Sequence, residues 1–565
     1  MTGREPAFSE LFTPKLVTIL RERYRFADLR ADAVAGFTVA IVALPLSLAI
    51  AIASGVTPDR GLYTAIVGGF IVSMLGGSRF QIGGPAGAFI VLVAATVARH
   101  GLDGLILATM LSGLILLAVG LLRLGTFIKY IPYPVTVGFT SGIAVVIFAT
   151  QLKELLGLTL ARPEPGPIVE KLGALGTALP TANPAAMLIA VLTIAIILVL
   201  RRFRPHWPAF VIAIAFAAAM AWSAALPVET IGTRFGGIPQ SLPVPHLPVL
   251  TLGKIGEVLP AALSFALLGS IESLLSAVVA DSMTGRRHRS NAELVAQGAA
   301  NIASALFGGI CVTGTIARTA TNVRAGARGP VAGMLHSLFL LLFMLLAAPL
   351  ASYVPLAALA GVLAVVCWTM AEKHEFVTLL RASRGDATVL LVTFLLVVLR
   401  DLTTGILAGF ALGVLLFLHR MAEAVEVERA LPAVGEDRGD RAASDGRTPY
   451  DPEVAVDPAI IVFRISGAFF FGTAAAVGAA LDRVGEQPKA YVVDFSDVPV
   501  LDSTAAATIK GLAGKADRQG ATLYLTATRP RIRRALFAHG VRPPHARYKA
   551  SLAAAVAAEI GRAHV

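Results

Sequence analysis

Long apolar segments alternate with short polar ones over most of the first 420 residues of the chain. A helix needs roughly 20 apolar residues to cross the hydrocarbon core of a bilayer, so most of these segments are long enough, or nearly so, to span a membrane. The segments expected to cross are 33–53, 62–76, 82–98, 104–122, 133–150, 186–201, 208–226, 258–281, 294–310, 330–351, 354–371, 387–399 and 402–419, with the polar-flecked stretch 312–326 as a further short element. The pattern predicts a polytopic α-helical membrane protein with about fourteen spans.

Composition agrees with this pattern, because 56% of the residues are hydrophobic and only 15% are charged. A soluble chain is about one quarter charged. The formal net charge of +12 suggests a nucleic-acid partner at first, but the basic residues lie in short loops at alternate ends of the spans, so none is expected. Cys311 and Cys367 lie in apolar runs, which predicts neither a disulfide framework nor a metal site. No cofactor is expected, and without a Walker A motif ATP-driven pumping is not supported.

The basic residues also predict the orientation of the spans. The first 30 residues are polar, show no cleavable signal peptide and carry Arg21, Arg23, Arg25 and Arg30 just before the first span. The positive-inside rule therefore puts the N-terminus in the cytoplasm. Later loops keep this bias only if 312–326 crosses the membrane. Seven spans in each half make two odd-numbered halves of opposite orientation, which predicts a 7+7 inverted repeat.

The character of the chain changes after residue 420. Residues 421–456 are charged and loop-like, which predicts a linker. Strand patterns (AIIVFRISGAFFFG, KAYVVDFSDV, ATLYLTAT) then alternate with helix patterns (TAAAVGAALDRVGE, STAAATIKGLAGKADRQG, RPRIRRALFAHG). The alternation predicts a small α/β domain of about 100 residues. The expected organisation is a cytoplasmic N-terminal segment (1–30), a membrane domain (31–420), the linker (421–456) and a cytoplasmic domain (457–565).

Several ordered blocks resemble the sulfate permease (SulP) family of anion transporters. They are ALPLSLAIAIASG, GGSRFQIGGPAGAF, IPYPVTVGFTSGIAV, GSIESLLSAVVADSMTGRRHRSNAELVAQGAANI and TGTIARTATNVRAGA, followed by VPVLDSTAAATI, which looks like a STAS domain. The resemblance is closest to the bacterial proton-coupled C4-dicarboxylate branch. It implies core and gate domains that move like an elevator, a small anion as substrate, a homodimer and the bacterial inner membrane, with no enzymatic activity. Sulfate, C4-dicarboxylates and bicarbonate all fit as substrates.

The third and tenth elements are the candidate anion site. Gly84, Pro85, Ala86 and Gly87 stand at a helix start, where proline suits the first turn and the helix dipole favours an anion. A kinked or tightly packed span is the other interpretation. Thr313, Gly314 and Thr315 open the matching element, and Arg318 lies one turn further on. An intramembrane arginine indicates a functional site, although Arg318 would also be explained by an ion pair with a carboxylate.

The resemblance adds three apolar residues to the candidate site. Leu46 and Ile50 in the first span, and Phe89 early in the third element, match positions that line the substrate cavity in relatives. Without that match, all three would be interpreted as ordinary helix packing.

Glu272 is a carboxylate in the middle of an apolar run, with Ser276 one turn later on the same face. Burial disfavours its charged form, so we expect Glu272 to take up and release a proton near neutral pH. A protonated Glu272 would not repel an anion, so the proton and the anion would bind together, which is symport. A fixed ion pair with Arg318 and a sodium site formed with Ser276 remain the alternatives. In sodium-dependent relatives the matching pair is Asp and Thr.

Asp502 and Ser503 occupy the position where related anti-sigma antagonists are phosphorylated on serine. A helix N-cap is the simpler role for Ser503, and a regulatory phosphosite is the alternative. Three rival functions stay open for the whole chain. An intramembrane enzyme would need clustered Asp or His ligands for a metal or phosphate, whereas the spans show single ionisable groups. An anion exchanger or channel would not move substrate against its gradient with a proton. A nucleobase permease shares the fold, but the STAS domain and Arg318 argue against it.

Overall fold

The computed structural model describes residues 11–126, 131–162, 164–204, 207–423, 426–430, 460–470, 473–474, 477 and 488–563. The chain divides into two compact units, Met1–Ala411 and Leu412–Val565. The larger unit is almost entirely helical, and the smaller one is built on a five-stranded sheet.

The helices of the larger unit have very different lengths, and the last of them, α19, continues along the chain into the smaller unit. They are α2 (Lys15–Arg21), α3 (Phe26–Ala53), α4 (Pro58–Tyr63), the π-helix η1 (Thr64–Gly68), α5 (Gly69–Leu75), η2 (Gly87–Phe89), α6 (Ile90–Leu121), η3 (Leu124–Thr126), α7 (Tyr133–Leu156), α8 (Ile168–Ala178), η5 (Leu179–Thr181), α9 (Pro184–Phe203), α10 (Ala209–Ser223), α11 (Ile231–Phe235), α12 (Leu252–Thr284), α13 (Ser290–Leu306), α14 (Ile316–Arg324), α15 (Val331–Ala351), α16 (Leu356–Met370), α17 (Lys373–Ala382), α18 (Arg384–Leu399) and α19 (Leu402–Glu423), together with the two-residue strands β1 (Gly83–Gly84) and β2 (Thr313–Gly314).

The predicted membrane architecture is confirmed. Within the described residues, eight helices are long and apolar enough to cross a membrane on their own. The other crossings are short or broken. Helix α6 bends at Gly101, whose φ of 66° is a conformation that glycine adopts readily, so α6 supplies two crossings. With the continuous stretch α4–η1–α5 and with α10, α13, α14 and α18, these elements account for the expected fourteen.

The third and tenth elements are discontinuous, as the sequence predicted. Each begins as a two-residue strand and continues as a helix, β1 leading to η2 and α6, and β2 leading to α14. The two strands pair antiparallel, with Gly83 opposite Gly314 and Gly84 opposite Thr313. Equivalent elements of the two halves therefore run in opposite directions, which is what an inverted repeat produces.

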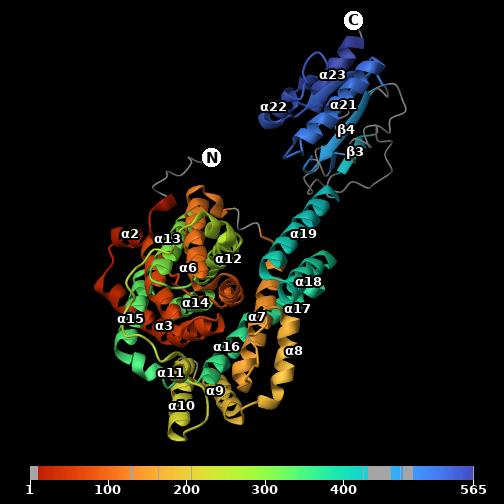
Figure 1. Ribbon diagram of the computed structural model, residues 1–565. Coiled ribbons are helices and arrows are strands. Elements are labelled where there is room, and N and C mark those ends of the chain that lie inside the picture. Colours follow the sequence, from red (N-terminus) through yellow and green to blue (C-terminus); the bar gives the residue numbers. More distant parts are fainter. Residues whose placement is uncertain are drawn as a thin grey trace. The chain divides into compact units, whose positions relative to one another are not determined.

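The helices of the larger unit form two groups. In Figure 1 one group gathers around α3, α6, α12 and α15, and the other around α7, α8 and α18. The first group contains both broken elements. It is held together by the packing of α3 on α15 and of α12 and α13 on α6, while α3 also touches α10 and α16 of the second group. These groups correspond to the expected core and gate.

Small residues let the helices of the first group approach closely. A β-carbon on Gly113 of α6 would lie 2.7 Å from the carbonyl oxygen of Gly298 on α13, and one on Gly298 would lie 2.6 Å from the carbonyl oxygen of Gly113. Close backbone contact through small residues is the usual way in which helices associate in lipid. This crossing therefore depends on glycine in both helices.

The smaller unit has the predicted α/β character. Its sheet has the order β3-β4-β5-β6-β7, in which only the β3–β4 pair is antiparallel. The strands are β3 (Glu426–Ala430), β4 (Ile460–Ser466), β5 (Ala490–Asp494), β6 (Thr522–Thr526) and β7 (Arg547–Lys549), and the helices are α21 (Ser503–Gln519), α22 (Pro530–Ala538) and α23 (Leu552–Ala563). Helices α21 and α22 cover one face of the sheet, and α23 covers the other.

Several elements were not predicted from the sequence. Helices α8, α11 and α17 lie in segments expected to be loops, and β3, β7 and α23 extend the small domain. Within the predicted linker, residues up to Glu423 continue α19 and 426–430 form β3, so the sheet begins before residue 457; residues 431–456 lie outside the described residues. Most of the expected helix TAAAVGAALDRVGE also lies outside them.

Candidate anion site at the crossing of the two broken elements

The candidate site is the place where β1 and β2 cross and two helices begin. Neither η2, which starts at Gly87, nor α14, which starts at Ile316, is capped by a side chain. Each helix start carries a partial positive charge, so the two together favour an anion near the crossing. The predicted residues Pro85, Ala86 and Thr315 lie between the strands and these helix starts.

Arg318 lies inside this crossing and is 2% exposed. Its Nη2 donates hydrogen bonds to Ser47 Oγ at 3.1 Å and to the Pro85 carbonyl oxygen at 3.3 Å, so the second half of the chain is bound to the first. Within the described residues Nη1 has no hydrogen-bond partner and Arg318 forms no ion pair. A buried cation without a counter-ion is strongly unfavourable. Chemically, a guanidinium in this position can accept the negative charge of a ligand.

Glu272 lies in α12 and is 7% exposed, with its Oε2 atom buried and unpartnered among the described residues. The fixed ion pair with Arg318, which the sequence left as an alternative, is absent from the described contacts. Ser276 is engaged elsewhere, because its hydroxyl donates to Thr319 Oγ1 at 3.0 Å. Thr319 Oγ1 also accepts a hydrogen bond from the backbone N–H of Ile82. Glu272 is thus a carboxylate with free acceptor capacity, one helical turn from a serine that donates its hydrogen to Thr319.

Helix α12 is bound both to the second broken element and to the segment just before β1 through further hydrogen bonds that the sequence did not reveal. Thr313 Oγ1 donates to the Gly269 carbonyl oxygen at 3.2 Å, and Gln81 Nε2 donates to Ser273 Oγ at 2.8 Å. The Gln81 side chain lies directly over Gly314, where a β-carbon would clash with it. The sequence did contain a signal for these residues: they are polar side chains in or next to apolar spans, and such side chains need hydrogen-bond partners when buried.

Leu46, Ile50 and Phe89 are 7%, 5% and 1% exposed and belong to one apolar cluster of the larger unit. The Phe89 ring lies 6.0 Å, centroid to centroid, from Phe265 of α12. All three residues pack within the first group of helices, and their expected role in lining a substrate cavity stays a prediction.

Two other buried carboxylates have the opposite character to Glu272, because each is occupied by backbone donors. Glu293 Oε2 accepts from the N–H groups of Gly77 and Ser78 at 2.9 and 3.0 Å, just before β1. Asp32 accepts from Gly329 N–H at 3.1 Å and from the Tyr24 hydroxyl. Burial and the bond to Asp32 raise the pKa of Tyr24, so this phenol stays a donor. Both carboxylates brace the loops that lead to or from the broken elements.

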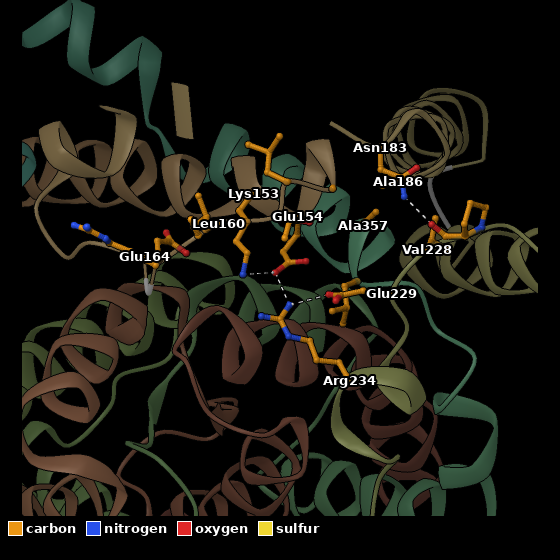
Figure 2. Close-up of a pocket in the computed structure, with 17 residues that line it drawn as sticks. Lys153, Glu154, Leu160, Glu164, Asn183, Ala186, Val228, Glu229, Arg234 and Ala357 are labelled. Carbon is orange, nitrogen blue, oxygen red and sulfur yellow. Dashed lines mark hydrogen bonds and ion pairs between the residues drawn. The ribbon is translucent and has the colours of Figure 1, made fainter. Parts of the chain in front are cut away.

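A second polar region lies away from the crossing. A cavity of about 550 Å³ is lined by the end of α7, by the segments around α8 and α11 and by the start of α16. Figure 2 shows Arg234 beside Glu154 and Glu229, with ion-pair distances of 2.6 and 3.4 Å, and Lys153 beside Glu154 at 3.7 Å. Because carboxylates neutralise these cations, the cavity offers an anion less free positive charge than Arg318 does.

The described residues contain no group of three or more His, Cys, Asp or Glu side chains able to hold a metal ion. In the small domain, the expected N-cap role of Ser503 is wrong. Asp502 is the N-cap of α21, and its side chain accepts a hydrogen bond from Ala505 N–H at 2.9 Å. Aspartate is an equally good cap and precedes the serine, which leaves Ser503 exposed as the first helical residue.

Discontinuous elements from the two halves of a chain, meeting at a buried arginine that has no ion pair among the described residues, are typical of membrane transport proteins. Residues 29–393 match the model of the sulfate permease family, and residues 451–551 match that of the STAS domain. The chain belongs to the sulfate permease family.

Similar proteins are named as anion transporters. The putative sulfate transporter YvdB of Bacillus subtilis is 39% identical over 89% of this chain and 92% of its own length. The bicarbonate transporter BicA of Synechocystis is 31% identical over 92% of this chain and 91% of its own length.

Solved structures have the same fold. Murine Slc26a9, an anion transporter solved in the inward-facing state, superposes with a TM-score of 0.85 at 18% identity and covers 99% of this chain and 96% of its own. The transmembrane domain of a cyanobacterial BicA covers 69% of this chain and 98% of its own, with a TM-score of 0.61 at 31% identity.

Proposed function

We propose that the protein is a secondary active transporter that moves a small anion of the sulfate, C4-dicarboxylate or bicarbonate class together with a proton. The observation that carries the proposal is a pair of buried groups without described partners: Nη1 of Arg318 at the crossing of the broken elements, and Oε2 of Glu272 on α12, the helix that packs against β2 and α14. The arginine and the helix dipoles supply a positive field for the anion. Gly84, Gly87 and Thr313–Thr315 provide the backbone against which it binds.

Glu272 is the proposed coupling residue. When it is ionised, its charge opposes the entry of an anion, and when it is protonated that repulsion disappears. Anion and proton therefore favour each other's binding, which is the thermodynamic requirement for symport. A sodium ion in place of the proton is the alternative: the Ser276 hydroxyl donates its hydrogen to Thr319 and keeps oxygen lone pairs able to bind a cation, so the choice falls to the sodium gradient in the test below.

An elevator-type movement suits the division of the larger unit into two groups of helices. Both broken elements, Arg318 and Glu272 lie in the first group, so moving that group as a body would carry the whole site. The second group would remain as the gate. We further propose a bacterial plasma membrane location with the N-terminus and the STAS domain in the cytoplasm, a homodimeric assembly, and Ser503 as an accessible regulatory phosphosite.

The test is uptake of labelled sulfate, succinate and bicarbonate by the full chain in proteoliposomes, under an inward proton gradient, an inward sodium gradient or neither. We expect the proton gradient to drive accumulation of at least one of these anions, and Arg318→Ala to abolish it. Arg99→Ala, which removes an exposed arginine from α6, is the control and should transport normally. Accumulation with sodium alone would overturn proton coupling, flux that never exceeds equilibrium would indicate a channel, and no uptake of any anion would overturn the proposal.

A further inference from the structure

His336 lies in the second turn of α15, is 0% exposed, and has no described hydrogen-bond partner for either ring nitrogen. A neutral imidazole carries one donor and one acceptor, and buried polar groups of this kind are almost always satisfied. Two unsatisfied nitrogens on one buried ring need an explanation. The transport mechanism proposed above does not use this residue.

The neighbourhood of His336 is tightly packed and contains another unpartnered group. Helix α15 packs on α3, α5 and η1. A β-carbon on Gly36 of α3 would lie 3.1 Å from the His336 backbone nitrogen, so the two helices nearly touch at this level. On α5, Ser73 lies against Gly333, one turn before His336, and its buried hydroxyl also lacks a described partner.

Few charged groups can act on the ring. Helix α15 has no other titratable residue, and neither η1 nor α5 has any. Helix α3 carries Asp28, Arg30 and Asp32 near its start, and Asp32 is occupied by Tyr24 and Gly329. Helix α14 carries Arg324 at its end and Arg318, which lies close to this part of α15. Ser337, the residue after His336, donates to the Ala65 carbonyl oxygen, and a β-carbon on Gly84 would lie 3.7 Å from Ala65 Cα and 2.4 Å from Arg318 Nη1.

We propose that His336 is a second proton-binding site of the transporter and that it takes up its proton when the anion binds. This inference rests on the proposed function and adds a residue to it. A proton from solvent adds to the lone pair of one ring nitrogen, giving an imidazolium, and no other bond changes. In the empty site, the imidazolium and the Arg318 guanidinium would be two cations in a low-dielectric interior, which is strongly unfavourable.

A bound anion reverses this balance. Its negative charge near Arg318 offsets the repulsion, so the protonated ring becomes favourable only in the loaded site. Release of the anion then expels the proton. Glu272 and His336 respond in the same sense but lie on different helices, α12 and α15, and their contributions are separable by substitution.

The experiment measures how many protons the protein takes up per anion bound. Titration calorimetry of sulfate and of succinate into the purified full chain, in buffers of different ionisation enthalpy, gives this number for wild type, His336→Gln and Glu272→Gln. Ser337→Ala is the matched control, because it removes a structural hydrogen bond to the Ala65 carbonyl on the same turn of α15 and no titratable group. A merely structural role of His336 would change affinity without changing the proton count.

We expect His336→Gln to lower the proton count by about one and to make the dependence of log affinity on pH shallower by about one per pH unit. Glu272→Gln should lower the count separately, and Ser337→Ala should leave it at the wild-type value. An unchanged count in His336→Gln together with a lower one in Glu272→Gln overturns this inference and leaves the proposed function standing. No proton uptake by the wild type overturns both. Should His336→Gln not fold, NMR of histidine-labelled wild type reads the ring directly, and a neutral His336 with anion bound contradicts the inference.

Discussion

Arg318 and Gly84 come from opposite halves of the chain, and the guanidinium of Arg318 fills the space that a side chain at position 84 would need. A β-carbon on Gly84 would lie 2.4 Å from Arg318 Nη1, the guanidinium nitrogen that has no described partner. The glycine is therefore required by the arginine, and the arginine reaches the crossing only because strand β1 carries no side chain there. This contact joins the two repeats at the point where we place the anion.

Gly84→Ala should abolish transport while leaving the protein folded. The added methyl group must displace the guanidinium from Pro85 and from the crossing, because the atom it meets is closer than real β-carbon contacts allow. Anion uptake into proteoliposomes measures the loss, and size-exclusion chromatography checks the fold. Gly256→Ala on α12 is the control, since nothing lies within 4 Å of its β-carbon position. Normal uptake by Gly84→Ala would contradict the assigned position of Arg318.

Ser47→Ala should weaken anion binding without abolishing it. The substitution removes one of the two acceptors that orient Nη2, at 3.1 Å, and leaves the Pro85 carbonyl oxygen in place. A hydrogen bond to a charged group contributes about 1.5–3 kcal/mol. Because the Pro85 bond still orients the guanidinium, we expect only the lower part of this loss to reach anion binding, so the KM for uptake should rise about tenfold. If Ser47→Ala has the same KM as the wild type, Ser47 does not position the arginine.

Glu293→Ala should destabilise the membrane unit. The Gly77 and Ser78 N–H groups would lose their acceptor in a buried place, which costs about 1–3 kcal/mol for each unsatisfied group. A lower thermal unfolding midpoint of the detergent-purified protein is the expected result. Glu257→Ala removes an exposed carboxylate of α12 and should leave the midpoint in place. Equal midpoints for the two variants would mean that Glu293 does not brace the loop before β1.

Asp502→Ala should destabilise the small domain by about 1 kcal/mol, because the N-cap hydrogen bond to Ala505 N–H is lost. Ser503→Ala, one position later and exposed, should change stability by less than about 0.5 kcal/mol. Chemical denaturation, followed by a probe in this domain, measures the free energy of unfolding of each variant. The reverse order of effects would restore Ser503 as the capping residue.

Hydrophobic patterning was sufficient to predict the membrane architecture, because lipid imposes length and apolarity on every span. The broken elements were also visible, since Gly84 and Pro85 in one and Thr313 and Gly314 in the other interrupt apolar runs. Helix α13 shows the limit of this signal. Its polar side chains, among them Glu293, weaken the apolar pattern in the sequence. In the fold they are buried against other helices, so the helix still lies within the membrane unit.

The hydrogen-bond partners within the site could not be predicted, because they join residues that are far apart in sequence. Gln81 and Ser273 are 192 positions apart, and Arg318 and Ser47 are 271 apart. The sequence identified Glu272 and Arg318 as unusual but left open whether they pair. Only the fold shows whether these two side chains form a fixed ion pair or each keep an atom that is free to make a hydrogen bond. His336 was missed, since a single histidine in an apolar run has no distinctive local pattern.

Glu272→Gln tests the coupling claim most directly, because the amide keeps the shape of the protonated carboxyl and cannot release a proton. The measurement compares two fluxes of the same anion in the same proteoliposomes: exchange of external labelled anion for internal unlabelled anion, and accumulation driven by an inward proton gradient. The account predicts that Glu272→Gln retains exchange and accumulates clearly less anion than the wild type, because only the proton assigned to His336 is still coupled to transport. Accumulation at the wild-type level in this variant would contradict the assignment of Glu272 as the coupling residue.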